Sequence, residues 1–371
     1  MGIVVTYAVD EGLTRHEVAG RVAVARSLAA LKGFEFGGGY EPSLQRSERS
    51  SRLYFVPSET LSGHEAARLG IRGADDLFGG VVPYPFVATK TIVHPLAGRD
   101  AQRPQGWSEG FAQRVRAVVL PGFSAFTRAD ALKAAQRLLE DGPVRLKHGR
   151  GIGGKGQWVA KDAIEVAAAL EAIEPAELAR CGLVLEPSLE EEATYSVGQV
   201  RVDGLCASYC GTQKATTDNR GQAAYGGSDL VIVRGDYDAL EKLPLPEGMR
   251  TAIRQARVFD AAAAEFPGLF ASRRNYDVLS GRDARGRRHC GVLEQSWRIG
   301  GASGPEVAAL EAFRADPGLR AVRACSTEAY GADAAVPAVV PSGARVQFQG
   351  VDPQAGPLVK FTIVEPHGTA H

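Results

Sequence analysis

The chain has 371 residues, of which 44% are hydrophobic and 23% are charged. This composition is typical of soluble globular proteins and excludes disordered and fibrous classes, and the length predicts two or three domains or subdomains. Lys and Arg together number 43, as do Asp and Glu. No excess charge attracts nucleic acid or an anionic membrane, so we expect neither as a partner.

The cysteines and the N-terminal residues predict a cytoplasmic location. The five cysteines form no C-x-x-C pair, which argues against a disulfide framework or a structural zinc site. Cys206 and Cys210 share a face of a predicted strand. A metal pair would fit there, but the pattern favours buried small hydrophobes. The N-terminus lacks a basic flank and no apolar run reaches about 18 residues, so neither a signal peptide nor a membrane span is indicated.

Strand and helix patterns alternate over the first part of the chain. Short apolar runs predict strands, and capping boxes predict the helices that follow them. The strands are expected at 2–9 and 52–57, and the caps at Thr14, Glu17, Ser62 and Glu65. This order predicts a small α/β unit with a parallel sheet. The glycines and arginines of 33–51 suggest a flexible polar segment, which we expect to contribute substrate contacts.

From residue 123 onward the strand and helix patterns are mixed. Strands are expected at 143–147, 157–161, 183–187, 194–202, 205–210 and 228–234, and helices at 129–142, 163–173, 246–266 and 304–313. Asp203 and Gly204 predict a two-residue hairpin turn of type I′, and 281–295 a second hairpin. The rest of the chain reads as an Ala/Gly/Pro-rich tail.

A glycine loop at 149–156 fits three templates. It matches the dinucleotide fingerprint G-x-G-x-x-G and most of a P-loop. Both of those require a helix directly after the glycines, but the strand pattern 157–161 follows, and Gly156 stands where a P-loop needs Ser or Thr. The third template is a phosphate-covering loop between two antiparallel strands, with Lys147 placed to neutralise phosphate charge. An ordinary turn is disfavoured because five of the eight residues are glycine and two are basic.

This strand, loop and strand pattern resembles the ATP-grasp superfamily, in which a lysine-ended strand precedes a mobile glycine loop. The resemblance runs from about Phe123 to about Ser303, and more loosely through the N-terminal unit. It implies an α/β and α+β architecture. The expected divisions are an N-terminal α/β domain at 1–122, a lid subdomain at 123–192, and a C-terminal subdomain with the metal site and tail at 193–371.

The resemblance also implies an ATP site. Its residues would be Lys147, Gly151, Gly153, Gly154, Lys155, Glu186, Leu189 and Glu192. Glu186 would meet the adenine edge through its neighbouring backbone, and Leu189 would pack on the ring. Glu192 would accept the ribose hydroxyls, with Glu191 an equal candidate. Taken alone, however, 183–187 reads as a plain core strand with an exposed glutamate at its end.

Two late segments, RRNYDVLSG and CGVLEQSWRIGGAS, resemble the paired strands that hold Mg²⁺ in this superfamily. Asp277 and Glu294 occupy the carboxylate positions, and one or two carboxylates with phosphate oxygens suit Mg²⁺. Ser296 replaces the usual Asn, and it could ligate through a water, or Gln295 could substitute. The alternative is an exposed hairpin pair neutralised by neighbouring arginines, namely Arg274, Arg287 and Arg288.

Further basic residues complete the implied catalytic set. Lys90 resembles the first phosphate lysine of the superfamily, although a solvent-exposed lysine is an equal interpretation, and Arg298 would orient the acceptor carboxylate. Lys214 and Arg220 could reach the γ-phosphate or an anionic substrate.

The implied activity is an Mg-ATP-dependent ligase that joins a small-molecule carboxylate to an amine or thiol through an acylphosphate. It would be ADP-forming, and a homodimer is expected from the superfamily. One rival is an ATP-binding protein without ligase activity, with a regulatory or scaffold role. The other is a phosphotransferase or carboxylase on the same fold.

Overall fold

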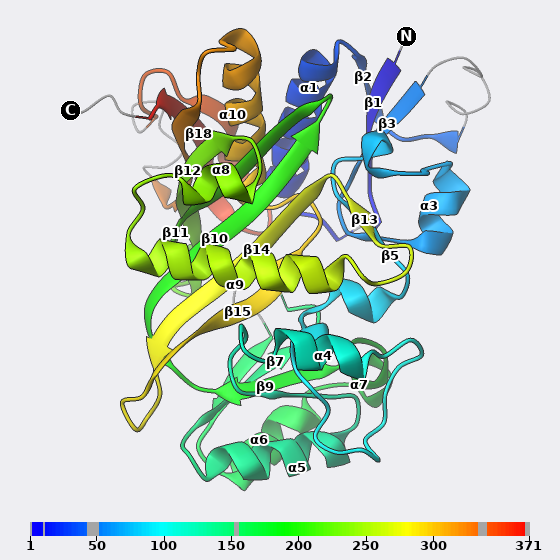
Figure 1. The fold of residues 1–371 in the computed structure, drawn as a ribbon, viewed down its shortest axis with the longest axis vertical. Coiled ribbons are helices and arrows are strands. Elements are labelled where there is room, and N and C mark those ends of the chain that lie inside the picture. Colours follow the sequence, from blue (N-terminus) through cyan, green and yellow to red (C-terminus); the bar gives the residue numbers. More distant parts are fainter. Residues whose placement is uncertain (1, 10–11, 43–51, 152–155, 333–339, 368–371) are drawn as a thin grey trace.

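The computed structural model describes residues 2–9, 12–42, 52–151, 156–332 and 340–367. Within these ranges the strands form four sheets, two of them large enough to organise a lobe each. Figure 1 shows the strands and helices of 123–187 gathered in a lower lobe, beneath the larger upper body. Parallel and antiparallel sheets both occur, so the predicted α/β and α+β class is confirmed.

A parallel sheet forms the N-terminal part, as predicted. Its strands are β1 (Gly2–Tyr7), β2 (Glu35–Gly39) and β3 (Arg52–Pro57), in the order β2-β1-β3. The helices are α1 (Arg15–Lys32) and α3 (Gly63–Leu69), and both begin at the predicted capping boxes. Each box satisfies backbone N–H groups that the first turn of a helix leaves without partners.

The prediction of a flexible segment at 33–51 is wrong for its first part, because β2 lies there and pairs with β1. One glycine of β2, Gly37, serves close packing. A Cβ atom on Gly37 would lie 2.6 Å from Cγ2 of Ile3, so only glycine lets the two strands keep their side-chain layer. Residues 43–51 lie outside the described residues.

The segment after α3 links the two lobes. It contains β5 (Gly80–Val82), α4 (Glu109–Val115) and the 3₁₀ turns η1 (Ala74–Asp76), η2 (Pro85–Ala88) and η3 (Lys90–Val93), and β4 (Leu61–Ser62), which precedes α3, pairs with β5. β5 pairs with β13 (Phe270–Ala271), so the late part of the chain returns to this segment. None of the helices in the described ranges is both long and apolar enough to cross a bilayer.

The lower lobe is a four-stranded antiparallel sheet covered by helices. Its strands are β6 (Phe123–Ala125), β7 (Val144–His148), β8 (Gln157–Ala160) and β9 (Leu183–Pro187), in the order β6-β9-β7-β8. Its helices are α5 (Arg128–Leu139), α6 (Ala163–Glu171) and α7 (Pro175–Cys181). β7 and β8 pair antiparallel across the glycine loop, which confirms the strand, loop and strand prediction.

The upper body is built on an eight-stranded sheet in the order β15-β14-β10-β11-β12-β16-β18-β17. The strands are β10 (Glu190–Val202), β11 (Leu205–Thr217), β12 (Ala223–Arg234), β14 (Arg273–Arg282), β15 (Arg288–Ser296), β16 (Ala321–Tyr330), β17 (Arg345–Asp352) and β18 (Gly356–Pro366). Asp203 and Gly204 join β10 to β11 with φ angles of 51° and 76°, as the predicted type I′ turn requires.

The prediction of an irregular Ala/Gly/Pro-rich tail is wrong. β16, β17 and β18 extend the large sheet, with β16 paired to β12 and β18 paired to both β16 and β17. Composition summed over the tail hid the alternation within it. On β16, for example, buried Val322 and Ala324 alternate with the exposed Arg323, which is the period-2 pattern of a strand with one covered face.

Helices cover both faces of the large sheet (Figure 1). α9 (Glu247–Ala263) packs on one face, where Phe259 contacts Tyr276. The short α8 (Tyr237–Glu241) lies beside it, while α10 (Ser303–Ala315) and α1 cover the other face. An ion pair crosses from that face to α10, with Arg273 Nε 2.9 Å from Glu306 Oε2. Both side chains are fully buried, and Tyr209 also donates a hydrogen bond to Glu306.

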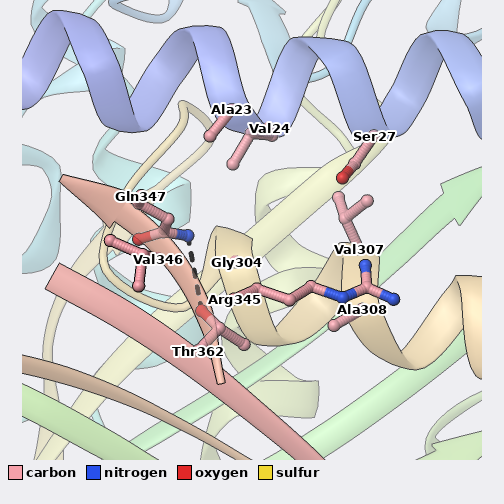
Figure 2. A pocket seen from close by; sticks show the side chains of 10 residues that line it. All are labelled: Ala23, Val24, Ser27, Gly304, Val307, Ala308, Arg345, Val346, Gln347 and Thr362. Atoms are coloured by element: carbon pink, nitrogen blue, oxygen red, sulfur yellow. Dashed lines mark hydrogen bonds between the residues drawn. The ribbon is translucent and has the colours of Figure 1, made fainter. Parts of the chain in front are cut away.

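A hollow of about 160 Å³ lies between α1, α10 and the β17–β18 pair (Figure 2). Three of its polar side chains are partnered: Gln347 Nε2 donates to Thr362 Oγ1 over 3.3 Å, and Arg345 forms an ion pair with Glu311. No predicted site residue lines this hollow. The predicted site residues Lys90, Lys147 and Glu294 lie instead where the linking segment, the lower lobe and the large sheet meet.

The Arg273–Glu306 pair should dominate the attachment of α10. We expect Arg273→Met to lower the free energy of unfolding by about 3–5 kcal/mol, because it leaves the Glu306 carboxylate buried without its partner. Arg254→Met is the control, since Arg254 pairs with Glu247 at the surface and should contribute about 0–1 kcal/mol. Thermal and urea unfolding measure both. Equal losses in the two variants would contradict the prediction.

Candidate active site

The structure gathers the predicted lysines and arginine around one carboxylate. Lys90 begins η3, Lys147 lies near the end of β7, and Arg298 follows β15. Lys90 Nζ lies 2.7 Å from Glu294 Oε2. Burial alone would raise the pKa of Glu294, but the charges of the three cations lower it below its ordinary value. Three segments far apart in the sequence therefore meet at Glu294.

A second carboxylate stands opposite Glu294. Asp277 on β14 is paired in register with Glu294 on β15, next to an irregularity in the pairing. Gln213 Nε2 donates a hydrogen bond of 2.7 Å to Asp277 Oδ1. Burial, and then the charge of Glu294, raise the pKa of Asp277 to about 7. The pair thus resists carrying two negative charges, and a bound cation would relieve that repulsion.

The arginines near this hairpin bind elsewhere. Arg274 pairs with Asp260, Arg287 with Asp283, and Arg288 with Glu192. The interpretation of Asp277 and Glu294 as an exposed pair neutralised by these arginines is therefore wrong. The cation that contacts Glu294 comes from η3, in another part of the chain.

Glu186 at the end of β9 is buried, so the interpretation of an exposed glutamate there is also wrong. It forms an ion pair with Lys147, and His94 Nε2 lies 2.7 Å from its other oxygen. Burial favours the neutral acid, but the Lys147 charge and the His94 hydrogen bond lower the pKa of Glu186 to about 2. Lys147 and Glu186 therefore form a buried ion pair at the start of the glycine loop.

The glycine loop begins in close contact with its surroundings. A Cβ atom on Gly149 would lie 2.1 Å from the carbonyl oxygen of Cys181, so only glycine fits at this position. Gly149 N donates to Gly182 O, and Gly151 N donates to His148 O. Gly153, Gly154 and Lys155 lie outside the described residues.

Comparison with known proteins places the chain. A family model described as "Protein of unknown function (DUF3182)" matches residues 4–362. The chain belongs to this family. No curated protein matches it significantly.

Solved structures resemble the chain over nearly its whole length. Carboxyaminoimidazole ribonucleotide synthase from Aspergillus clavatus, complexed with ATP, is 14% identical with a TM-score of 0.52, and the match covers 98% of this chain and 94% of that one. N5-carboxyaminoimidazole synthetase from Staphylococcus aureus, complexed with ADP, is 11% identical with a TM-score of 0.53, covering 98% and 93%. Phosphoribosylamine–glycine ligase from Thermotoga maritima is 14% identical with a TM-score of 0.51, covering 98% and 92%. The ATP-grasp fold predicted from the sequence is thus confirmed.

In this DUF3182 chain, Gln295 and Ser296, which follow Glu294, both make hydrogen bonds within the protein. Gln295 is buried and its Nε2 donates to the carbonyl oxygens of Val87 and Thr89, which leaves only its Oε1 as an atom that could ligate a metal in place of the usual Asn. Ser296 Oγ accepts a hydrogen bond from Arg273 Nη1 over 3.4 Å. Arg273 also donates to the carbonyl oxygen of Arg298.

The other predicted site residues make contacts with neighbouring side chains and backbone groups. Leu189 is buried between β9 and β10, and Glu192 pairs with Arg282 and Arg288. Lys214 pairs with Asp229, and Arg220 donates to the carbonyl oxygen of Gln354. None of these contacts tests a role in binding ATP or substrate, so the roles of these four residues stay predictions.

Sequence reasoning missed three polar residues of the site. His94 and Gln213 lie in no recognisable motif, and Glu59 lies after β3 with its Oε2 3.4 Å from Arg298 Nε. Their partners are between 64 and 239 positions away in the chain. No local pattern could have indicated them.

The carboxylate pair predicts a pH dependence. A pKa raised to about 7 in the folded state means that ionising Asp277 costs stability as pH rises from about 4 through about 7. Without metal, Asp277→Asn should therefore unfold at a higher temperature than wild type at about pH 8, and the difference should shrink at about pH 5. Thermal unfolding in the presence of a chelator measures this.

Glu171→Gln, at an exposed position of α6, serves as the control and should show no such pH-dependent difference. If wild type and Asp277→Asn keep the same difference at both pH values, Asp277 does not titrate in this range.

Proposed function

We propose that this protein is an Mg-ATP-dependent, ADP-forming ligase that activates a small-molecule carboxylate as an acylphosphate for attack by an amine or thiol. One observation carries the proposal: Lys90 of the linking segment lies 2.7 Å from Glu294, which is paired in register with Asp277, and the charges of Lys147 and Arg298 act on the same carboxylate. A cluster of that kind suits phosphoryl transfer, in which the protein mainly positions groups and neutralises charge. The ATP and ADP bound in two of the similar structures support it.

Asp277 and Glu294 would hold the magnesium ion. The two residues are paired on adjacent strands, and the raised pKa of Asp277 indicates that Lys90, the cation at Glu294, does not offset the charge of both carboxylates. Hard oxygen donors of this kind are what Mg²⁺ prefers. Because the Ser296 hydroxyl is engaged by Arg273, we assign it a contact to a metal-bound water. When bound, the ion would offset the negative charge of the triphosphate.

Lys90 and Lys147 would bind the phosphates. Both lysine side chains are buried, with about 5% of each residue exposed, so their charges are poorly screened by water and attract an anion strongly. In this structure Lys90 contacts Glu294 and Lys147 contacts Glu186. Gly151, Gly153, Gly154 and Lys155 would cover the phosphates from the loop.

The nucleoside would lie along the start of β10. We propose that the backbone beside Glu186 meets the adenine edge, that Leu189 packs on the ring, and that Glu192 or Glu191 accepts the ribose hydroxyls. The divisions 1–122, 123–192 and 193–371 are the matching proposal for the domains. A homodimer and a cytoplasmic location stay predictions.

Arg298 would orient the substrate carboxylate. Arg298 lies two residues after the end of β15, and its guanidinium group pairs with Glu59, which lies after β3. Ligands of open α/β sheets bind at the carboxyl ends of the parallel strands, where Glu59 lies. A substrate carboxylate would take the place of the Glu59 carboxylate at the guanidinium group of Arg298, because a planar guanidinium group can form two parallel hydrogen bonds with a carboxylate.

A specific observation keeps a second function in view. Ser296 replaces the Asn of the superfamily pattern and is hydrogen-bonded to Arg273, which would weaken a metal site. An ATP-binding protein without ligase activity is the resulting alternative. Nucleotide turnover separates the two functions, since both require binding.

Nucleotide binding is tested by thermal unfolding with and without Mg-ATP. Ligand at about 100 times its dissociation constant should add about 2.7 kcal/mol of stability to the wild type. Lys147→Ala and Glu294→Ala should lose most of that gain, whereas Lys133→Ala, on the exposed side of α5, should keep it. No gain in the wild type would remove the basis of the proposal.

The carboxylate role is tested by ADP release in a screen of carboxylate and amine or thiol pairs. For an active pair, we expect Arg298→Lys to raise the KM of the carboxylate about tenfold or more, because Lys cannot form the bidentate contact. The KM of ATP should change little. ADP release without an amide or thioester product would favour a phosphotransferase.

A further inference from the structure

Gln295 is buried beside Glu294 but makes its contacts on the other side of the strand. Its Nε2 donates to the carbonyl oxygen of Val87 over 2.9 Å and to that of Thr89 over 2.7 Å. Only about 5% of the residue is exposed, and its Oε1 has no hydrogen-bond partner among the described residues. Both amide hydrogens are therefore committed to the turn that immediately precedes Lys90.

That turn is short and internally tied. Thr89 separates η2 from η3, its N and Oγ1 both donate to Phe86 O, and its Oγ1 lies 2.6 Å from Thr91 Oγ1. These bonds shape the turn but do not attach it to the large sheet. Gln295 supplies that attachment, since it joins the turn to β15. Lys90 is the next residue after Thr89 and the last of the 87–90 turn, and its Nζ lies 2.7 Å from Glu294 Oε2.

The same turn also contacts the lower lobe. Lys90 N donates to Gly149 O at the start of the glycine loop over 3.4 Å. Ser124 Oγ on β6 donates to Thr91 O. The turn therefore lies between the strand that carries the carboxylate and the lobe that carries the loop. The position of the turn therefore determines where the Lys90 ammonium group lies relative to Glu294 and to the glycine loop.

We infer that Gln295 is a positioning residue, which fastens the 87–90 turn to β15 and so sets the Lys90 ammonium where it can bind a phosphate group of the nucleotide. This rests on the proposed function. A side chain without amide hydrogens leaves the carbonyls of Val87 and Thr89 buried without donors, and the turn is then free to shift. The Lys90 side chain itself would be unchanged, so the effect reaches the nucleotide only through its position.

The test is a double-mutant cycle on Mg-ATP affinity, measured by calorimetry on wild type, Gln295→Met, Lys90→Met and the double variant. Met keeps the length of Gln but donates nothing. Gln295→Met should weaken Mg-ATP binding about tenfold. In the Lys90→Met background it should have little further effect, because coupled residues are not additive.

Gln255→Met is the matched control. Gln255 Nε2 also donates to a backbone carbonyl of β15, that of Cys290, over 2.9 Å. It lies on α9, so its loss should leave Mg-ATP affinity unchanged. Thermal unfolding without nucleotide shows whether each variant is folded and how much stability the two glutamine substitutions cost.

The outcomes separate the inference from the proposed function. If wild type binds no Mg-ATP, both fail. If wild type binds and Gln295→Met binds equally well, or weakens binding by the same factor with and without Lys90, Gln295 has no positioning role and the inference alone is overturned. A coupled loss with an unaffected Gln255→Met supports it.

Discussion

The structure depends on pairing buried charges between distant segments. An ionised side chain loses its hydration when it is buried, so it must find an opposite charge or hydrogen bonds in the protein. Lys147 with Glu186, Lys90 with Glu294, and Arg273 with Glu306 meet this requirement. The first pair ties two strands of the lower lobe together, and the other two pairs attach the linking segment and α10 to strands of the large sheet.

The large sheet places the candidate site at the edge of its helix-covered core. α1 and α10 cover one face with apolar side chains, and the N-terminus of α10 lies directly after the segment that contains Arg298. Near the β14–β15 edge of the sheet polar side chains replace the apolar ones, and Asp277 accepts a hydrogen bond from Gln213 there. The lower lobe brings Lys147 to this edge. The carboxylates thus lie where a helix-covered core ends and a second lobe begins, which is a usual place for a ligand cleft.

Two sequence interpretations failed because they treated composition as conformation. Glycines at 37–39 were assigned to a flexible segment, yet glycine also allows strands to approach closely, as Gly37 does beside Ile3. The Ala/Gly/Pro-rich tail contains three strands, whose alternation is interrupted by the intervening turns. Gln295 follows Glu294 on the same strand, and because consecutive residues of a strand point to opposite sides, its amide reaches the turn at Val87 and Thr89.

The sequence by itself determined what is local. The capping boxes of α1 and α3, the turn at Asp203 and Gly204, and the lysine-ended strand before the glycine loop depend on neighbouring residues, and these appear as predicted. It also indicated the fold, because the order of these elements is characteristic. Only the tertiary structure decided which charges meet. Lys90 reaches Glu294, and His94 reaches Glu186, across long stretches of chain, and the ionisation of Asp277 depends on burial and on a partner from another strand. Desolvation and charge pairing exist only once the chain has folded.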